Sequence, residues 1–218
     1  MNPPWMNLFE QNLTKSAFIF FADRNNSTGT LYTQFKLCTI LVYVMLKTKR
    51  LTLSPVAKED LSFFLETRND PETSYFLTTM VPINEYMQDD WFRALCLDNS
   101  RMYFTIQLHD STRIGLVRCD EWDKINQSIR IGIDIAPAFR RNGYAKEAYE
   151  ALLPYLFNHM HLHRIWLLVA GYNTVAQALY TALGFQEEGM QKEAIFRDGK
   201  YYNYHMMSLL KSSYETKN

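Results

Sequence analysis

The chain reads Arg140-Arg141-Asn142-Gly143-Tyr144-Ala145 between a strand-like run, residues 129–135, and a helix-like run, residues 146–159. The first N–H groups of a helix have no internal partner, and the helix dipole adds partial positive charge at the same end. A phosphate or pyrophosphate can therefore bind there on bare backbone. The stretch is suited to hold a multiply charged anion.

The residue types of this stretch support that interpretation. Gly143 lets the backbone approach a ligand without a Cβ in the way, and Ala145 is small enough for the next turn to come close. Arg140 and Arg141 can add charge-assisted contacts to phosphate oxygens. An ordinary basic turn before a helix would use the same residues, so the rest of the chain has to distinguish the two.

The composition is that of a globular protein with a full core. Of 218 residues, 47% are hydrophobic and 21% are charged, as in ordinary folded domains. The 23 basic residues balance 23 acidic ones, so nothing indicates a nucleic-acid partner or an anionic membrane surface. The basic stretch is local, which favours a small anionic ligand.

Metal binding and disulfides are not indicated. The cysteines, Cys38, Cys96 and Cys119, are scattered without C-x-x-C spacing, which argues against a disulfide framework or a zinc site. Three histidines alternate near the end of the predicted helix, at positions 159, 161 and 163. They could face a metal, but histidine is also favoured at a solvated helix C-terminus. We prefer the second interpretation and expect no metal.

Residues 1–46 differ from the rest of the chain. Two short apolar patches, residues 17–22 and 37–46, flank a polar cluster, and the second patch falls short of the ~20 residues that a membrane span needs. The start of the chain is also a poor signal peptide. Three interpretations stay open: a packed extension, a disordered leader, or a coding region annotated from too early a start, which we favour slightly. We expect an extension over residues 1–46 and one domain over residues 47–213.

From residue 50 onward the hydrophobic pattern predicts a definite order of elements. A strand is followed by two helices and then by three strands in hairpin order, at residues 50–56, 58–67, 84–97, 102–108, 113–119 and 128–135. Next come a helix to His159 that Pro154 kinks, a strand, a helix that Gly184 ends, and two strands, at residues 164–169, 174–183, 185–190 and 201–210. This order predicts an α+β (mixed α/β) fold: a central mixed, mostly antiparallel sheet flanked by helices in three α-β-α layers.

Two motifs in this frame resemble the GNAT family of N-acetyltransferases. The acetyl-CoA loop of the family is Gln/Arg-x-x-Gly-x-Gly/Ala, and residues 140–145 supply it in full. Its second signature is an Asn, a Tyr seven residues later and Gly-Phe four residues beyond, which stand here as Asn173, Tyr180 and Gly184-Phe185. One motif alone is weak evidence, but both together, with a strand between them, are specific. The resemblance covers roughly residues 47–210, and the end of the chain is similar to a branch with ribosomal-protein-alanine and polyamine acetyltransferases.

The resemblance implies roles for the motif residues. The pyrophosphate of acetyl-CoA would bind the loop of Arg140, Arg141, Asn142, Gly143, Tyr144 and Ala145. The pantetheine arm would pair with backbone of the preceding strand, at Ile133 and Ile135, and a backbone N–H near Ile133 could serve the developing oxyanion. Asn173 would cap its helix and reach the arm. Tyr180 matches the family's acid, which protonates the leaving thiolate.

These residues predict a cytoplasmic enzyme that moves an acetyl group from acetyl-CoA to a primary amine by direct attack in a ternary complex. The acceptor could be a protein N-terminal alanine, a polyamine or an amino-sugar, and a homodimer stays open. Candidates for the general base are Asp120, Glu121 and Asp134, none of which is preferred. The alternative is an acyl-CoA-binding sensor without turnover, against which the intact Tyr180 argues. We expect the acceptor side to use the first two helices and the last hairpin, with acidic and aromatic candidates at Glu85, Asp89, Asp90, Tyr75, Phe76, Trp91 and Trp122.

Overall fold

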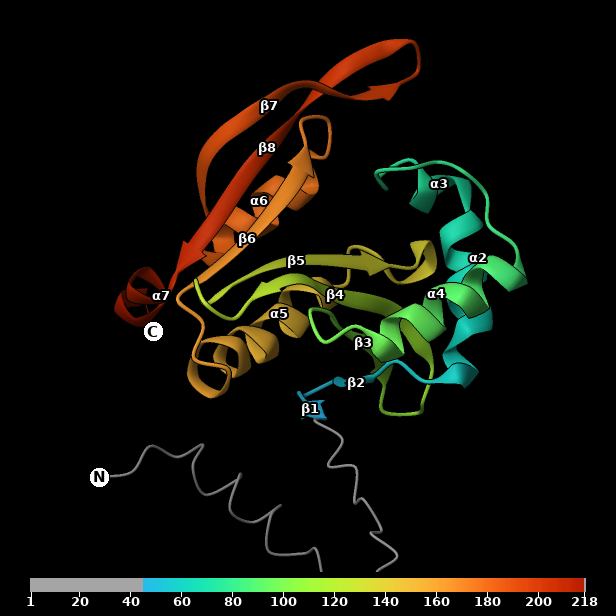
Figure 1. The fold of residues 1–218 in the computed structure, drawn as a ribbon, viewed down its shortest axis with the longest axis horizontal. Coiled ribbons are helices and arrows are strands. Elements are labelled where there is room, and N and C mark those ends of the chain that lie inside the picture. Colours follow the sequence, from blue (N-terminus) through green and yellow to red (C-terminus); the bar gives the residue numbers. More distant parts are fainter. Residues whose placement is uncertain (1–44, 218) are drawn as a thin grey trace, which may run out of the picture. The chain divides into compact units, whose positions relative to one another are not determined.

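Eight strands form one sheet in the computed structural model, which describes residues 45–217. The strand order is β1-β2-β3-β4-β5-β6-β8-β7, and the ribbon is drawn in Figure 1. The strands are β1 (Leu46–Lys47), β2 (Leu51–Pro55), β3 (Met102–Leu108), β4 (Arg113–Asp123), β5 (Ser128–Ile135), β6 (Arg164–Ala170), β7 (Gln186–Arg197) and β8 (Lys200–Leu210). Neighbours pair antiparallel except β5 and β6, which are parallel. The predicted mixed, mostly antiparallel sheet is confirmed.

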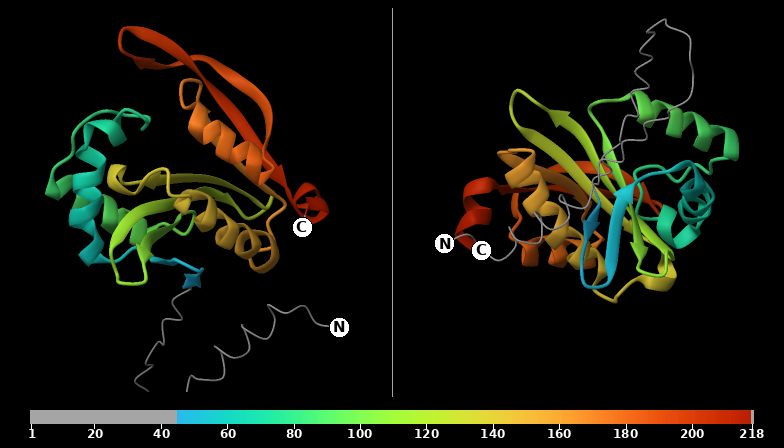
Figure 2. Two further views of the ribbon diagram at one scale, coloured as in Figure 1. Left: turned by 180° about the vertical axis from the view of Figure 1, so that it is seen from behind. Right: turned by 90° about the horizontal axis from the view of Figure 1, so that it is seen from below.

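Helices and short helical turns connect these strands. They are η1 (Lys58–Asp60), α2 (Leu61–Asn69), α3 (Pro71–Ser74), α4 (Glu85–Leu97), η2 (Pro137–Phe139), α5 (Tyr144–Pro154), η3 (Tyr155–His159), α6 (Thr174–Leu183) and α7 (Lys211–Lys217). The views from front and back place α2 to α4 at one end of the sheet and α7 at the other (Figures 1 and 2). Among the described residues, no helix is both long and apolar enough to cross a membrane.

Side chains of β3 show that helices cover both faces of the sheet. Tyr103 packs on Trp91 of α4, with ring centroids 5.7 Å apart. Phe104, the next residue, packs on Tyr155 of η3 at 6.5 Å. Because successive side chains of a strand point to opposite faces, α4 and the α5–η3 helix lie on opposite sides. The predicted α-β-α layering follows from this alternation.

Local signals set most of the helix ends. Asn84 caps α4 by accepting a hydrogen bond from Met87 N, and Gly184 ends α6 with a φ of 101°. The helix after the central motif begins at Tyr144, two residues earlier than predicted. At Pro154 its α-helical pattern gives way to the π-helical turn η3, because proline has no N–H to continue the ladder.

The predicted extension, residues 1–46, lies outside the described residues except for its end. Leu46 pairs with Leu53 and Lys47 with Thr52, so the sheet includes one residue before the predicted domain boundary. At the other end α7 extends past residue 213, where the predicted domain stopped. The sequence of α7 shows little hydrophobic periodicity of the helical kind, so the sequence does not predict this helix.

Parallel pairing between β5 and β6 is confined to one end of the two strands. Ser128, Ile129 and Arg130 pair with residues 164–166. Beyond this point the ribbons of β5 and β6 diverge (Figure 1). The two strands are therefore splayed apart at the carboxyl end of β5.

Candidate active site

A cleft of about 1270 Å³ occupies the place where β5 and β6 separate. Its walls come from β5, the loop after β5, the start of α5, the end of β6, α6, the segment after α3, and the β7–β8 hairpin. Nine of the ten residues predicted to form the site line this cleft: Ile133, Ile135, Arg140, Arg141, Gly143, Tyr144, Ala145, Asn173 and Tyr180. The tenth, Asn142, does not line it.

The loop before α5 has the backbone of an anion site. Gly143 precedes the helix with φ 80° and ψ 2°, and no side chain caps the first turn of α5. Arg141 is also left-handed, with φ 64°. Free amides at a helix start and left-handed residues next to them form a concave donor surface. The sequence predicts a diphosphate site at this loop, and that assignment stays a prediction.

The edge of β5 offers unpaired backbone to the cleft. Ala136 N donates to Ile114 O of β4 at 2.9 Å. Since alternate residues of a strand turn their backbone groups to opposite sides, Ile133 and Ile135 turn theirs away from β4. The Ile135 carbonyl accepts from the Arg140 side chain at 2.9 Å. The N–H of Ile135 and both groups of Ile133 are therefore directed toward the space between the strands.

Tyr180 lies on α6 and is 6% exposed. Asn173 fixes the start of this helix by accepting from Ala176 N at 3.2 Å. Burial raises the pKa of the Tyr180 phenol, the Asp134 carboxylate adds to the rise, and Tyr149 and Arg118 act in the opposite direction. The phenol is thus protonated at neutral pH and can act as an acid.

Comparison with known proteins agrees with this geometry. A family model described as an acetyltransferase (GNAT) domain matches residues 50–186. The chain belongs to the GNAT family. It is accordingly an N-acetyltransferase, with acetyl-CoA as its co-substrate.

Two curated relatives and one solved structure illustrate the likeness. The chain is 31% identical to a spermidine N(1)-acetyltransferase of Vibrio cholerae over 167 residues, which are 76% of this chain and 95% of that protein. It is 31% identical over 86 residues to a [ribosomal protein bS18]-alanine N-acetyltransferase of Haemophilus ducreyi, covering 39% of this chain and 59% of that one. The crystal structure of the Vibrio cholerae enzyme in complex with CoA and spermine superposes with a TM-score of 0.72 at 30% identity, covering 77% and 99% of the two chains.

The structure places Arg140 differently from the simplest expectation for a GNAT loop. Its guanidinium donates to Ile135 O at 2.9 Å and to Thr73 Oγ1 at 2.8 Å, and it lies 3.5 Å from the Glu72 carboxylate. These contacts tie α3 to the end of β5. Asn142 likewise turns its amide back onto Phe139 O and Arg140 O, which stabilises the loop.

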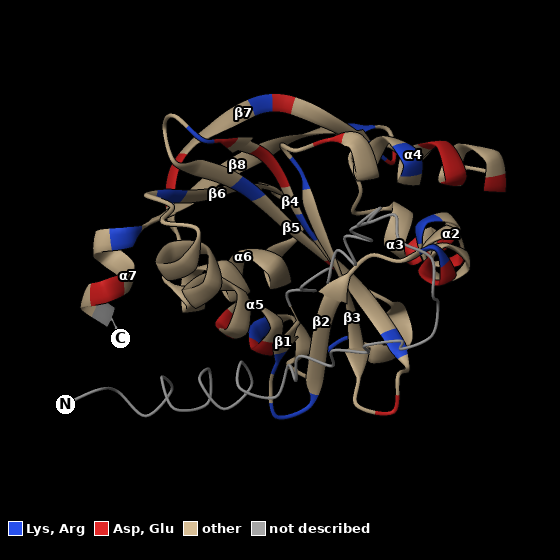
Figure 3. Cartoon of the chain, turned by 60° about the horizontal axis from the view of Figure 1, so that its bottom comes forward, with Lys and Arg blue, Asp and Glu red and all other residues tan. Residues whose placement is uncertain are grey.

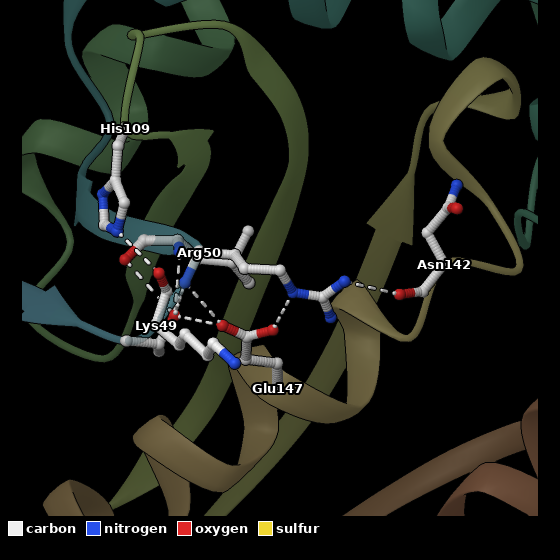
Figure 4. Close-up of polar contacts among 7 residues, drawn as sticks. Lys49, Arg50, His109, Asn142 and Glu147 are labelled. Carbon is white, nitrogen blue, oxygen red and sulfur yellow. Dashed lines mark hydrogen bonds and ion pairs between the residues drawn. The ribbon is translucent and has the colours of Figure 1, made fainter.

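Two residues of the loop's surroundings were not singled out from the sequence. The Arg50 guanidinium lies between the Glu147 carboxylate and the Asn142 carbonyl (Figure 4). It also stacks over the Tyr144 ring, 4.6 Å from the centroid. The sequence carries no local signal for this contact, because Arg50 comes from the turn before β2 and Glu147 from α5.

The three carboxylates considered as general base are engaged with arginines. Asp134 lies 3.2 Å from Arg118 Nη2, and Asp120 accepts from the Tyr103 hydroxyl and lies 3.7 Å from Arg130. Glu121 is exposed and pairs with Arg130 at 3.1 Å. Asp120 and Asp134 line the cleft, whereas Glu121 does not. Within residues 45–217, no group of three or more His, Cys, Asp or Glu side chains is placed to hold a metal ion.

A strap of hydrogen bonds joins the segment after α3 to the tip of the β7–β8 hairpin. Arg197, 6% exposed, donates to Tyr75 O at 2.9 Å and to Leu77 O. The Tyr75 hydroxyl donates to Asp198 at 2.8 Å. Tyr172, which follows β6, also donates to Tyr75 O at 2.9 Å. The strap lies beside the cleft, which Tyr75, Leu77 and Tyr172 line.

Of the aromatic acceptor candidates, Tyr75 and Phe76 line the cleft and the two tryptophans do not. Trp91 packs on Tyr103, and Trp122 lies under Lys124 at 4.7 Å. The acidic candidates belong to α4, outside the lining of the cleft. That helix carries charges of both signs on its surface (Figure 3), in line with a solvated face.

Proposed function

We propose that the chain transfers the acetyl group of acetyl-CoA to a primary amine by direct attack of the amine in a ternary complex. The position of Tyr180 carries this proposal, because its ring lines the same cleft as Gly143 and Ile133. An anion site, an open strand edge and a phenol thus share one cavity. This combination suits a coenzyme that has a diphosphate at one end and a thioester at the other.

We assign the binding of acetyl-CoA mainly to backbone groups of the protein and less to its side chains. The amides from Arg141 to Ala145 would hold the diphosphate. The backbone of Ile133 and Ile135 would pair with the amides of the pantetheine arm, and Asn173 at the start of α6 would reach the same arm. The left-handed Gly143 and the missing side-chain cap of α5 support the first assignment.

Bound in this way, acetyl-CoA supplies an activated acetyl group. As the amine attacks, a backbone N–H near Ile133 is suited to donate to the carbonyl oxygen, where negative charge develops. Tyr180 donates its proton to the sulfur as the C–S bond breaks. Because Asp120 and Asp134 are engaged with arginines, the proton of the ammonium passes to water in the cleft.

A small polycationic amine is the acceptor class that fits this cleft best. Its acceptor side is lined by the aromatic side chains of Tyr75, Phe76, Tyr172 and Tyr204, and a cation is attracted to aromatic faces. Glu72 adds negative charge at the exposed rim. A relative that aligns over 76% of this chain is named for spermidine. A protein N-terminal alanine and amino-sugars are the competing acceptors.

An acceptor screen tests the proposal. Release of CoA thiol from acetyl-CoA is measured with spermidine, spermine, an alanine-terminated peptide and glucosamine. We expect the highest kcat/KM with a polyamine. Highest turnover with the peptide or the sugar would overturn the acceptor class, and binding of acetyl-CoA without turnover of any amine would favour the sensor alternative.

Replacement of Tyr180 tests the chemistry. We expect Tyr180→Phe to lower kcat roughly 100-fold while the Kd of acetyl-CoA changes little, because general acid catalysis contributes about 10²–10⁴-fold. Tyr201→Phe removes an exposed hydroxyl of the hairpin and serves as the matched control. A Tyr180→Phe enzyme with the wild-type kcat would contradict the assignment.

A further inference from the structure

A second tyrosine lies behind Tyr180, deeper in the protein. Tyr149 comes from the middle of α5 and is completely buried. Its ring centroid is 5.9 Å from that of Tyr180, with the ring planes tilted by 57°. Phe185 packs on Tyr180 at 5.8 Å, so Tyr180 contacts a phenol and a phenyl ring. Of these two neighbours, only Tyr149 carries a polar atom.

The hydroxyl of Tyr149 is unusual for its surroundings. It belongs to the main hydrophobic core and makes no hydrogen bond of ordinary geometry within the part of the chain that the structure describes. Burying an unsatisfied hydroxyl costs stability that phenylalanine at the same position would not. Packing alone therefore explains the ring of Tyr149 but not its oxygen.

The polar and charged groups around the two tyrosines are few. Asp134 of β5 and Arg118 of β4 act electrostatically on Tyr180, and Arg118 and the Cys119 thiol, also of β4, act on Tyr149. Arg118 pairs with Asp134 through Nη2, and its buried Nε, which has no partner among the described residues, is a donor and cannot accept from the Tyr149 hydroxyl. This leaves the Tyr180 oxygen as the natural acceptor for the Tyr149 hydroxyl.

We propose that Tyr149 is a positioning residue for the acid step, donating its hydroxyl to the Tyr180 oxygen when Tyr180 gives up its proton. The inference rests on the proposed role of Tyr180. Tyr149 does not touch either substrate and acts through its neighbour. The acid step then depends on two phenols: Tyr180, which lines the cleft, and Tyr149, which is buried behind it.

The direction of the electrostatic coupling agrees with a donor in this position. Burial is the largest cause that raises the pKa of Tyr149, and its interaction with Tyr180 raises it further. The same interaction lowers the pKa of Tyr180. A hydrogen-bond donor loses acidity and an acceptor gains it when the bond stabilises the acceptor's anion.

The proton balance of the step is closed. The proton of the Tyr180 hydroxyl moves to the sulfur as the C–S bond breaks, which leaves CoA thiol and a Tyr180 phenolate. Tyr149 keeps its own proton and shares it in a hydrogen bond to that phenolate. The acceptor nitrogen gives up two protons to water, one from the ammonium before attack and one as the amide forms. One of them returns to Tyr180 and the other leaves to solvent as H⁺, so the enzyme returns to its starting state.

Tyr149→Phe tests the proposal because it removes one oxygen and keeps the ring. We expect kcat to fall roughly tenfold, the order expected for a hydrogen bond to a charged group, while both KM values stay within about twofold. We also expect the alkaline limb of the kcat profile to move to higher pH, since a Tyr180 phenolate without a donor is less stable. Melting temperature reports on packing and should not fall.

Tyr155→Phe is the matched control, because Tyr155 is a second core-packed phenol on the same continuous helix and contacts Phe104 instead of Tyr180. Its kcat and pH profile should equal those of the wild type. A Tyr149→Phe enzyme with wild-type kcat and an unmoved alkaline limb would overturn the proposal and make Tyr149 a core residue only.

The outcomes separate this inference from the function on which it rests. If Tyr180→Phe loses activity and Tyr149→Phe does not, only the positioning role of Tyr149 fails. If Tyr180→Phe retains full activity, the acid assignment itself fails, and with it the proposal for Tyr149. If the Tyr149→Phe protein is unstable, Tyr149→Met tests packing without a hydroxyl, and a loss of kcat at preserved melting temperature in either variant supports the role.

Discussion

The Arg50 Nε atom lies 2.7 Å from Glu147 Oε2, although the two residues are 97 positions apart in the chain. The other carboxylate oxygen, Oε1, accepts from the Arg50 backbone N–H at 2.8 Å and from Thr48 Oγ1 at 2.6 Å. Burial disfavours the charged form of Glu147, but these hydrogen bonds outweigh it and lower its pKa. Glu147 therefore stays ionised at neutral pH and anchors Arg50, whose Nη1 donates to Asn142 O at 3.1 Å.

This contact is expected to fix the loop that binds acetyl-CoA. Glu147→Gln keeps the size of the side chain and removes its charge, so Arg50 loses its partner and releases the Asn142 carbonyl. We expect the KM for acetyl-CoA to rise roughly fivefold to tenfold with little change in kcat, as for the loss of a charge-assisted hydrogen bond. Glu150→Gln, one turn further along α5 and exposed, is the control. Equal KM values in the two variants would contradict the anchoring role.

Gly143 is expected to be required for its backbone conformation. At φ 80°, an alanine is strained by about 1–2 kcal/mol, and its Cβ would lie 3.6 Å from Arg50 Nη2, next to the amides proposed to hold the diphosphate. Gly143→Ala should lower the melting temperature and raise the KM for acetyl-CoA roughly tenfold. Gly199, in the β7–β8 turn, has φ 76° and open space around it. Gly199→Ala should lose similar stability without changing that KM, and a shared KM effect would show that strain alone is responsible.

Arg197 is expected to control the acceptor side of the cleft. It is buried, and its partners are the carbonyls of Tyr75, Leu77 and Phe196. Arg197→Leu removes this donor from Leu77 O and Phe196 O, at a cost of about 1–3 kcal/mol each when buried, and leaves Tyr75 O with Tyr172 as its side-chain donor, which loosens the strap. We expect the KM for the amine to rise roughly tenfold or more while the KM for acetyl-CoA stays constant. Lys200→Leu, in the same turn but exposed, should leave both unchanged; a rise confined to acetyl-CoA in Arg197→Leu would contradict this prediction.

Glu188 is expected to make stability pH-dependent in the acid range. Hydrogen bonds from Arg164, and then from Ser208, lower its pKa from 4.5 to about 2. A lowered carboxyl pKa stabilises the fold fully above the unfolded value of 4.5, and this contribution is lost as the pH falls through about 2. The Glu188 side chain is 38% exposed, so we expect only about 1 kcal/mol or less at pH 7.

Urea unfolding of the wild type and of Glu188→Gln from pH 7 to pH 2 measures this contribution. The difference in unfolding free energy should be constant at neutral pH and shrink between about pH 4.5 and 2. Glu193→Gln, at an exposed position of the same strand, is the control and should show a smaller difference. A gap between wild type and Glu188→Gln that does not change with pH would argue against the ion pair.

Most features that the sequence predicted depend on residues that are close together in the chain. Asn173 and Gly184 mark helix ends through neighbours within a few residues, and each acts as predicted. Asn84 caps α4 in the same local way. The family, the fold and the co-substrate could be predicted because the two motifs are short and contiguous. All three are confirmed. The roles of the individual site residues, the homodimer and the extension over residues 1–46 stay predictions.

Contacts between distant segments could not be predicted in the same way. Nothing around Arg50 in the sequence indicates Glu147 as its partner, and the helical pattern of α5 marks Tyr149 as a core position without pointing to Tyr180. Arg140 was predicted to bind phosphate from its place in the motif. Its guanidinium instead bonds Ile135 O and Thr73, a choice set by the packing of α3, which has only four residues and no pattern of its own.

The short parallel pairing between β5 and β6 has a consequence for the whole domain. Because pairing between β5 and β6 is confined to residues 128–130 and 164–166, the sheet consists of two parts, β1 to β5 and β6 to β8, that are joined by a few residue pairs. A long ligand bound between the two parts would contact both and hold them together. Binding would raise the free energy of unfolding by an amount that grows with the logarithm of the co-substrate concentration above its Kd, so the domain would be more stable in cells rich in the co-substrate than in starved cells.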